Sequence, residues 1–317
     1  MSNKETAFTQ AARQILGQVG TVISGKDPVL LWVLTAILAR GHILLEDIPG
    51  VGKTTMAVAF SKVLGLSCNR VQFTPDVLPS DITGYSIPDP ATGKLSYQPG
   101  AVLCNLFLAD ELNRATSRTQ SALLEAMEEG QVTVDGVRHK IPQPFTVIAT
   151  QNPAGAAGTQ LLPDSQIDRF ALRLSLGYPR VKDELTMVLN RREGNPMDRL
   201  TPVLNLETLC AMQDQVAATF LHELVAEYVV ALVDATRRNP YLLRGASPRA
   251  TLSIVALAKA TAQLQGRDFV TPRDVQAVFS QAVSHRLQLS PKATGSGKRM
   301  PQILKDILAA VPAPSLS

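Results

Sequence analysis

The sequence predicts an α/β domain with a mainly parallel sheet, followed by a smaller all-α domain. Four short runs have strand character, and the first two flank a helical segment as in a β-α-β unit. After Tyr178-Pro179 the pattern changes, because residues 180–290 show helical periodicity with little strand signal. We therefore expect domains over 1–178 and 179–290 and a flexible tail over 291–317.

Composition narrows the class of protein. The chain has 317 residues, 45% of them hydrophobic, which is enough to bury a sizeable core. Its net charge of +4 is small and scattered, which is weak evidence for nucleic-acid binding. The cysteines Cys68, Cys104 and Cys210 are dispersed, which argues against a disulfide framework and a zinc site. The most apolar run, 29–39, is too short to span a bilayer, and no signal-peptide core is visible, so we expect a cytoplasmic protein without membrane insertion.

The first strand leads into the most informative motif of the chain. This strand is Ile43–Leu45, and two helical patterns precede it, over 3–19 and 29–39. A Gly/Pro turn then leads to Gly52-Lys53-Thr54, which opens a helical segment, and this succession is typical of a phosphate-binding loop. Glycines let backbone N–H groups face a polyphosphate, and the helix N-terminus adds donors and a favourable dipole. We expect Lys53 to reach the β- and γ-phosphates and the Thr54 hydroxyl to bind Mg²⁺.

One residue departs from the pattern G-x-x-x-x-G-K-[ST], because Asp47 stands where the first glycine is expected. Asp tolerates left-handed backbone geometry better than most residues do, so we expect the turn to form. The alternative is a glycine-rich turn that happens to precede Lys-Thr.

A long segment, 74–100, follows a second predicted strand over Cys68–Phe73. It carries helix breakers where a crossover helix is expected, and 85–97 is hairpin-like. Loops of this length inside compact domains are more often functional than idle, although a decorated surface loop is the alternative.

The apolar strand Leu106–Glu111 ends in two carboxylates. We expect Asp110 to hold Mg²⁺ through its water shell and Glu111 to orient and polarise an attacking water. The alternative is an acidic cap on the next helix, 116–129, and the phosphate-loop pattern upstream disfavours it.

A hairpin is predicted over 131–141, because two alternating runs flank Asp135-Gly136. We interpret His139 in this hairpin as a surface residue rather than a ligand or base. The next buried strand, 144–150, ends just before Asn152. Ligands bind at the carboxyl ends of parallel strands, so Asn152 is a candidate to contact the γ-phosphate or the lytic water, with an Asn-Pro turn as the alternative.

Two arginines complete the candidates. Arg169 can neutralise transition-state charge on a phosphoryl group, a task that a neighbouring subunit often performs, and the alternatives are a salt bridge to Asp168 or a helix-end cation. Arg249 lies in the first turn of a helix that opens at Ser247-Pro248, where the helix dipole disfavours a cation, so it indicates an anionic partner such as nucleotide. Helices of this part are predicted over 181–192, 206–217, 222–238, 248–265 and 271–287, and a short amphipathic piece over Ile303–Leu308.

With these residues in view, about residues 20–285 resemble a MoxR-family AAA+ ATPase of the helix-2-insert clade. Four stretches carry the resemblance: FTPDVLPSDITG over 73–84, ADELNRA over 109–115, ATQNP over 149–153 and SPRA over 247–250. Acidic residues before Ile/Val-Pro-Gly are familiar in this family, so Asp47 no longer counts against a phosphate loop.

The resemblance implies a role for each candidate and implies ATP and Mg²⁺ as cofactors. The residues implied to hold the nucleotide are Ile23, Gly25, Pro49, Gly50, Val51, Gly52, Lys53, Thr54 and Thr55. Thr54 and Asp110 are implied metal ligands. The implied catalytic residues, besides Lys53 in Walker A, are Glu111 in Walker B, Asn152 as sensor 1, Arg169 as the arginine finger and Arg249 as sensor 2. Residues 74–100 match the helix-2 insert and 131–141 the pre-sensor-1 hairpin.

The family implies Mg²⁺-dependent ATP hydrolysis by a homohexameric ring that remodels or activates a protein partner, often one with a von Willebrand A domain. A DNA-dependent motor is one alternative, but the hairpins offer only Lys94, Arg138, His139 and Lys140, so we do not expect nucleic acid as a partner. A nucleotide-switched scaffold without productive hydrolysis is another, and the intact candidate set argues against it. Two departures, 154–159 and Ser117-Arg118, lie outside the nucleotide residues and bear on ring contacts or partner choice.

Overall fold

The computed structural model describes residues 6–48, 50–90, 93–151, 162–190 and 194–315. Pro49, Asn152 and the departure over 154–159 lie outside the described residues. A five-stranded sheet forms the centre of the first domain, all of its pairings are parallel, and its order is β2-β5-β8-β1-β9. The strands are β1 Ile43–Glu46, β2 Cys68–Gln72, β5 Leu106–Asp110, β8 Thr146–Gln151 and β9 Leu172–Leu174. The predicted α/β class is confirmed, and β9 is a strand that the sequence pattern did not predict.

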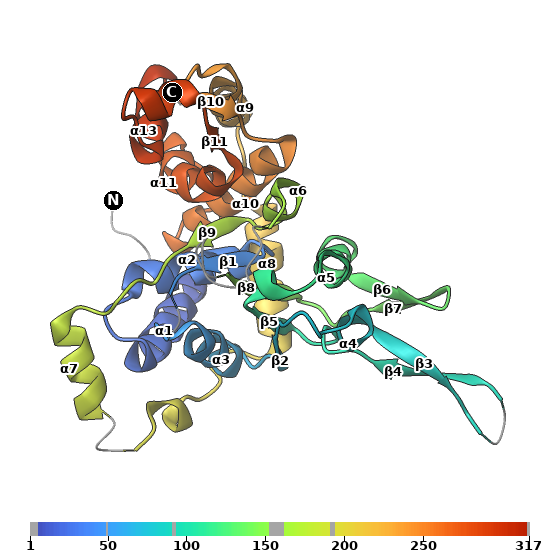
Figure 1. The fold of residues 1–317 in the computed structure, drawn as a ribbon. Coiled ribbons are helices and arrows are strands. Elements are labelled where there is room, and N and C mark those ends of the chain that lie inside the picture. Colours follow the sequence, from blue (N-terminus) through green and yellow to red (C-terminus); the bar gives the residue numbers. More distant parts are fainter. Residues whose placement is uncertain (1–5, 49, 91–92, 152–161, 191–193, 316–317) are drawn as a thin grey trace.

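Helices cover both faces of this sheet (Figure 1). They are α1 Ala7–Val22, α2 Asp27–Leu38, α3 Lys53–Val63, α5 Ser117–Glu129 and the one-turn α6 Asp164–Ile167, with a 3-10 turn η1 at Leu112–Arg114. Alternate strand residues point to opposite faces, so Ile43 and Leu45 join the core around α1–α3, whereas Leu44 joins the core around α5. The sheet therefore holds the carboxyl ends of β1, β5 and β8 rigidly between two apolar layers.

Two antiparallel hairpins project together from one side of the sheet (Figure 1). They are β3 Gly84–Pro88 with β4 Leu95–Pro99, and β6 Gln131–Val134 with β7 Val137–Lys140. The rings of Tyr97 and His139 stack at 3.6 Å between centroids, which joins the two hairpins. One helical turn, α4 Pro79–Thr83, precedes the first hairpin and was not predicted. It starts because Pro79 has a helix-compatible φ and because the Asp81 carboxylate accepts the Leu78 N–H.

The second domain is mainly helical, and its part from α9 to α13 lies above the sheet in Figure 1, whereas α7 lies at the lower left and α8 beside the sheet. Its helices are α7 Val181–Asn190, α8 Leu206–Ala218, α9 Glu223–Arg238, α10 Pro248–Leu264, α11 Pro272–Val283, α12 Pro291–Gly295 and α13 Met300–Ala310, with 3-10 turns η3 Pro196–Arg199 and η4 Ser284–Arg286. A small antiparallel pair joins β10 Leu242–Arg244 to β11 Gln288–Leu289. The domain boundary near residue 178 remains a prediction.

The tail differs from the expectation of flexibility after Pro291. Helix α13 docks on the second domain through Ile303, Leu304 and Ile307, which are buried in the main apolar core. The amphipathic piece expected over Ile303–Leu308 is thus the docked face, and its i, i+1, i+4 spacing places three apolar side chains on one side of the helix.

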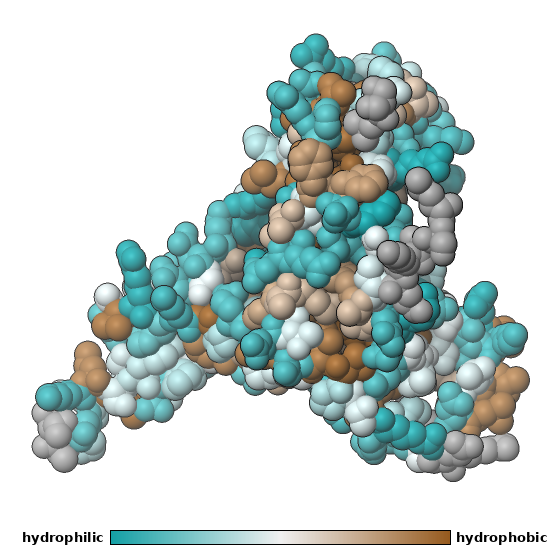
Figure 2. Space-filling view, turned by 180° about the vertical axis from the view of Figure 1, so that it is seen from behind, coloured by the Kyte–Doolittle hydropathy of each residue, from teal (hydrophilic) through white to brown (hydrophobic). Residues whose placement is uncertain are grey.

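Helix α7 stands at the edge of the molecule and exposes apolar side chains, as the brown patch in this region of Figure 2 shows. Val181, Leu185 and Val188 are more than half exposed. Among the helices in the described part of the chain, none is long and apolar enough to cross a membrane.

Candidate functional site

The loop between β1 and α3 has the geometry of a phosphate-binding loop. Gly50 and Gly52 have φ values of 84° and 94°, a region that residues with a Cβ rarely adopt. Gly52 is the N-cap of α3, so the first N–H groups of that helix face the loop. The buried Lys53 donates from Nζ to the carbonyl oxygens of Asp47 at 2.8 Å and Ile48 at 3.3 Å. Burial lowers the pKa of Lys53, and the carboxylates of Asp47, Asp110 and Glu111 act against that shift.

Asp47 has a different role from the expected left-handed turn residue. Its backbone is not among the described positions with positive φ, so the reasoning from left-handed geometry was wrong. Its buried carboxylate accepts instead from Ser175 Oγ at 3.1 Å and from the N–H groups of Leu176 and Gly177. A carboxylate satisfied by backbone N–H groups is well stabilised in a buried site. Asp47 therefore fixes the start of the phosphate loop to the segment that leads out of β9.

Asp110 lies opposite Thr54 at the end of β5. The Thr54 hydroxyl donates to Asp110 Oδ2 at 3.3 Å, and the Arg70 guanidinium forms an ion pair with the same oxygen at 2.8 Å. Mg²⁺ prefers hard oxygen ligands in octahedral geometry at ~2.1 Å, which places adjacent ligands ~3 Å apart. The two oxygens of Thr54 and Asp110 fit that requirement. The described residues contain no group of three or more His, Cys, Asp or Glu that could hold a metal ion by itself.

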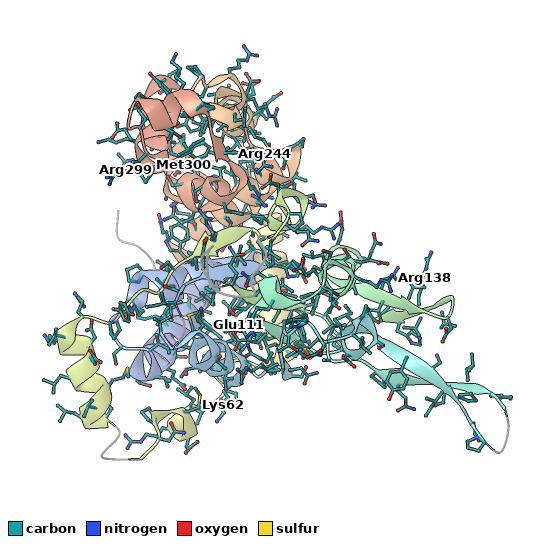
Figure 3. The ribbon with its side chains drawn as sticks, viewed as in Figure 1. Lys62, Glu111, Arg138, Arg244, Arg299 and Met300 are labelled. Carbon is teal, nitrogen blue, oxygen red and sulfur yellow. The ribbon has the colours of Figure 1, made fainter. Side chains whose placement is uncertain are left out.

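Glu111 follows in a left-handed conformation, with φ 57° and ψ 44°, at the carboxyl end of β5 near the centre of the first domain (Figure 3). Such a conformation costs ~1–2 kcal/mol at a residue other than glycine. A hydrogen bond from its N–H to Thr150 Oγ1, 2.8 Å long, holds it in place. The Glu111 carboxylate forms an ion pair with Arg114 at 2.8 Å.

Thr150 links the two carboxylates and is a site residue that sequence reasoning missed. Its hydroxyl accepts from the Glu111 N–H and donates to Asp110 Oδ1 at 2.7 Å, and its side chain is fully buried. Only its place at the end of β8, beside β5 in the sheet, brings it there. A polar residue at the end of an apolar strand was the available signal.

The glycine loop, Lys53, Thr54 and the two carboxylates at the end of β5 line one hollow of about 310 Å³. Its full lining is Gly50, Gly52, Lys53, Thr54, Thr55, Arg70, Asp110 and Glu111. A second hollow of about 230 Å³ begins at the same loop and extends between the end of α1 and α7. Its walls include Ile23, Ser24, Val51, Met187 and Asn190. A nucleotide would thus find polar groups for its phosphates in one hollow and an apolar wall for its base in the other.

Gly25 does not line either hollow. Its φ is 71°, and a Cβ at this position would clash with the carboxylate of Asp183 in α7. The neighbouring Lys26 donates to the carbonyl oxygens of Leu176, Gly177 and Tyr178. Gly25 therefore lets α7 approach the turn after α1 closely, and its implied contact with the nucleotide stays a prediction.

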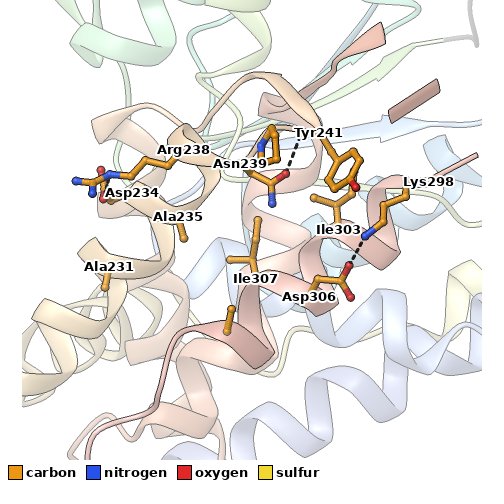
Figure 4. A pocket seen from close by; sticks show the side chains of 12 residues that line it. Ala231, Asp234, Ala235, Arg238, Asn239, Tyr241, Lys298, Ile303, Asp306 and Ile307 are labelled. Carbon is orange, nitrogen blue, oxygen red and sulfur yellow. Dashed lines mark hydrogen bonds and ion pairs between the residues drawn. The ribbon is translucent and has the colours of Figure 1, made fainter. Parts of the chain in front are cut away.

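The largest of the described hollows, about 570 Å³, lies elsewhere, between α9 and α13 in the second domain (Figure 4). Lys298 forms an ion pair with Asp306 at 2.9 Å at its rim, beside Tyr241. It lacks the glycine loop and the carboxylate pair, so we place the candidate site at the smaller hollows around Lys53.

Arg169 and Arg249 lie together, away from both hollows around the phosphate loop. Arg169 forms an ion pair with Glu128 Oε2 at 3.1 Å and donates to the carbonyl oxygen of Leu124. Arg249 forms an ion pair with Glu128 Oε1. One alternative for Arg169, a salt bridge to Asp168, is not formed, because Arg169 pairs with Glu128 and Asp168 with Arg286.

Asp168 instead binds the second domain. It forms an ion pair with Arg286 at 3.0 Å, and its two oxygens share the single O–H donor of Ser247, at 2.9 and 2.8 Å. Arg286 also donates to the carbonyl oxygens of Asp168 and Phe170, each at 2.9 Å, and burial lowers its pKa to about 10. Ser247 is the N-cap of α10, two residues before Arg249. The backbone that carries Arg169 is therefore fixed relative to the helix that carries Arg249.

Comparisons with known proteins agree with this arrangement. Residues 42–172 match the family described as the ATPase family associated with various cellular activities (AAA), and residues 234–307 match the AAA lid domain. An uncharacterised protein of Bacillus subtilis, YeaC, is 41% identical over 97% of this chain and 98% of its own length. Chaperone MoxR1 of Mycobacterium tuberculosis is 36% identical over 95% of this chain and 81% of its own length.

A crystal structure of a candidate ATPase from Cytophaga hutchinsonii superposes with a TM-score of 0.89 at 33% identity, covering 97% of this chain and 96% of that one. The likeness extends over both domains, so the sheet and the helical domain have the arrangement seen in that structure.

Proposed function

Because the chain belongs to the MoxR family of AAA+ ATPases, we propose that it hydrolyses ATP with Mg²⁺ as a ring of identical subunits and uses the energy to remodel a protein partner. The observation that carries this proposal is the single hollow in which Lys53, Thr54, Asp110 and Glu111 meet beside the glycine loop. This is the set of groups that phosphoryl transfer to water requires.

Each residue has a distinct task in this proposal. Lys53 holds the β- and γ-phosphates, and Thr54 and Asp110 are the protein groups that would hold Mg²⁺, which neutralises developing charge on the phosphate oxygens. Glu111 orients the attacking water and accepts its proton. Each carboxylate is ion-paired in this structure, Glu111 with Arg114 and Asp110 with Arg70. These ion pairs must therefore break before Glu111 can bind the attacking water and Asp110 can hold Mg²⁺. Asn152, the expected sensor 1, lies outside the described residues and remains a candidate.

The arginines support a ring. Neither Arg169 nor Arg249 lines the two hollows around the phosphate loop of its own subunit. A guanidinium that stabilises a γ-phosphate must touch it, so these residues would serve the nucleotide of a neighbouring subunit. Both would then act in trans, and closing the ring would give every site its arginines; six subunits is the number that the family implies.

The exposed side chains of the hairpins support a protein partner over nucleic acid. On the β3–β4 hairpin Tyr85, Ile87 and Leu95 are 52%, 44% and 63% exposed. Apolar exposed groups suit a protein surface, whereas DNA requires a dense row of cations. Arg138 lies far along the other hairpin and belongs to the few cations there (Figure 3). A von Willebrand A domain in the partner is part of the proposal.

The test uses two inactive variants of the full-length protein. Glu111→Gln should bind ATP but lose hydrolysis, and Arg169→Ala should also be inactive, since an arginine finger is worth ~10³-fold or more in kcat. Mixed together, they should regain part of the activity, because some interfaces then combine an intact Glu111 with an intact Arg169. Hydrolysis by Glu111→Gln at the wild-type rate would refute the role of Glu111, and no recovery at any ratio would refute a finger in trans.

The Glu111→Gln variant can also be used to find the partner. Because this variant should bind ATP without hydrolysing it, its rings should retain the partner, and mass spectrometry would identify the retained protein. A control with Lys53→Ala, which should not hold ATP, separates nucleotide-dependent partners from background. A partner retained equally by both variants would contradict coupling of binding to ATP.

A further inference from the structure

One carboxylate contacts both proposed trans arginines. Glu128, near the end of α5, meets Arg169 through Oε2 and Arg249 through Oε1, and both arginines use Nη2 for this contact. The arginines come from different domains, one from the segment after α6 and the other from the first turn of α10. Two guanidinium groups this close repel one another unless an anion lies between them.

We propose that Glu128 is a positioning residue that holds Arg169 and Arg249 side by side, so that both guanidinium groups reach the γ-phosphate bound to the neighbouring subunit together. This inference rests on the proposed function. Glu128 belongs to α5 and is part neither of the phosphate loop nor of the Asp110-Glu111 pair.

A second set of contacts supports this arrangement independently of Glu128. The Ser247 hydroxyl binds both oxygens of Asp168, so the residue before Arg169 is fixed to the N-cap of the helix that carries Arg249. Buried Arg286 holds the carbonyl oxygens on either side of Arg169. The two backbones are therefore set by the packed interior, and Glu128 sets the direction of the two side chains.

The exposure of the three side chains fits an interface rather than a core ion pair. Side-chain exposure is 27% for Arg169, 38% for Arg249 and 42% for Glu128. Arg169 uses Nη2 for Glu128 and Nη1 for the carbonyl oxygen of Leu124, and its Nε is buried. Each Nη carries two N–H groups, so one N–H on each of these nitrogens is left to meet a phosphate oxygen, and Arg249, which contacts Glu128 through Nη2, keeps further donors as well. A fully buried triad could not present them to another subunit.

The test compares Glu128→Ala with Glu129→Ala, a change at the adjacent, exposed residue of the same helix. Glu128→Ala should lower kcat of the ring by about tenfold to a hundredfold, because a misplaced catalytic group costs up to ~10²-fold. It should leave the affinity of the isolated subunit for a fluorescent ATP analogue unchanged, because Glu128 lines neither hollow around the phosphate loop. Glu129→Ala should change neither quantity.

Mixing distinguishes this role from a fault in the same subunit. Glu128→Ala mixed with Glu111→Gln should recover activity, because an intact Glu111 then faces arginines that an intact Glu128 holds. Unchanged or faster hydrolysis by Glu128→Ala alone, or no recovery on mixing, would overturn the proposal. A parallel mixture of Arg169→Ala with Glu111→Gln shows which idea has failed. If activity recovers in that mixture but not in the mixture of Glu128→Ala with Glu111→Gln, only the role of Glu128 is refuted. If activity recovers in neither mixture, the action of the arginines in trans is refuted.

Discussion

Replacing Thr150 by Val tests how the two catalytic carboxylates are held. Val keeps the shape of Thr but removes a hydroxyl that makes two hydrogen bonds, one from the Glu111 N–H at 2.8 Å and one to Asp110 Oδ1 at 2.7 Å. The side chain is fully buried, so water cannot replace the hydroxyl. Glu111 also loses the bond that holds its left-handed backbone.

The size of the effect follows from these contacts. A hydrogen bond to a charged group contributes ~1.5–3 kcal/mol, and an unsatisfied buried N–H costs ~1–3 kcal/mol. Thr150→Val should therefore lower the free energy of unfolding by about 2.5–6 kcal/mol, and kcat by about tenfold to a hundredfold, the range for groups that orient metal ligands. Urea unfolding measures the first quantity, and steady-state phosphate release with saturating MgATP measures the second.

Thr150→Ser is the matched control. It keeps the hydroxyl and removes one methyl group, so it should cost only ~1 kcal/mol of stability and retain kcat within about twofold. If Thr150→Val retained wild-type kcat, or if Ser were as damaging as Val, the hydroxyl would not be what positions Asp110 and Glu111.

Three further predictions concern the metal, the buried histidines and the tail. Arg70→Met should lower the Mg²⁺ concentration for half-maximal hydrolysis by about twofold to fivefold, because it frees Asp110 from a half-exposed ion pair worth at most ~1 kcal/mol; a higher requirement would contradict this. Burial lowers the pKa of His42 to about 4 and that of His285 to about 3, so below pH ~6.5 the unfolded chain binds more protons and stability falls as the pH falls toward those values. Urea unfolding at pH 5 should show a loss of roughly 2 kcal/mol per histidine relative to pH 7.5, and a pH-independent value once both are replaced by Gln would support this assignment. Leu304→Ala in α13 should cost ~2–5 kcal/mol in the same assay, and a loss below ~0.5 kcal/mol would mean that the tail does not dock.

The sequence predicted the parts of the site that lie in one continuous stretch. The glycine loop with Lys53, and the strand that ends at Asp110 and Glu111, are local patterns whose chemistry depends on residues a few positions apart. The hairpins were also predicted, because turn residues such as Asp135-Gly136 act locally. These elements form where they were expected.

Contacts between distant segments could not be predicted in the same way. Asp47 looked like a fault in the phosphate loop, but its carboxylate binds N–H groups about 130 residues further along the chain. Strand β9 has only three residues. Its place beside β1 is fixed by the parallel hydrogen-bonded pairing of the two strands and by the ion pair of Arg173 with Glu46. A three-residue run carries too little periodicity to identify a strand. Thr150 and Glu128 were missed for the same reason, since their partners lie in other elements.

The described contacts also bear on how the arginines can move. Arg286 is buried, and its guanidinium binds the Asp168 carboxylate and the carbonyl oxygens on both sides of Arg169. With a pKa of about 10 it stays charged at neutral pH, and breaking a buried pair from one side costs ~3–5 kcal/mol. That cost is a large fraction of the ~5–15 kcal/mol that stabilises a typical domain. The backbone of Arg169 therefore cannot turn independently of the helical domain of its own subunit, and Glu128 ties its side chain to Arg249 of the same domain.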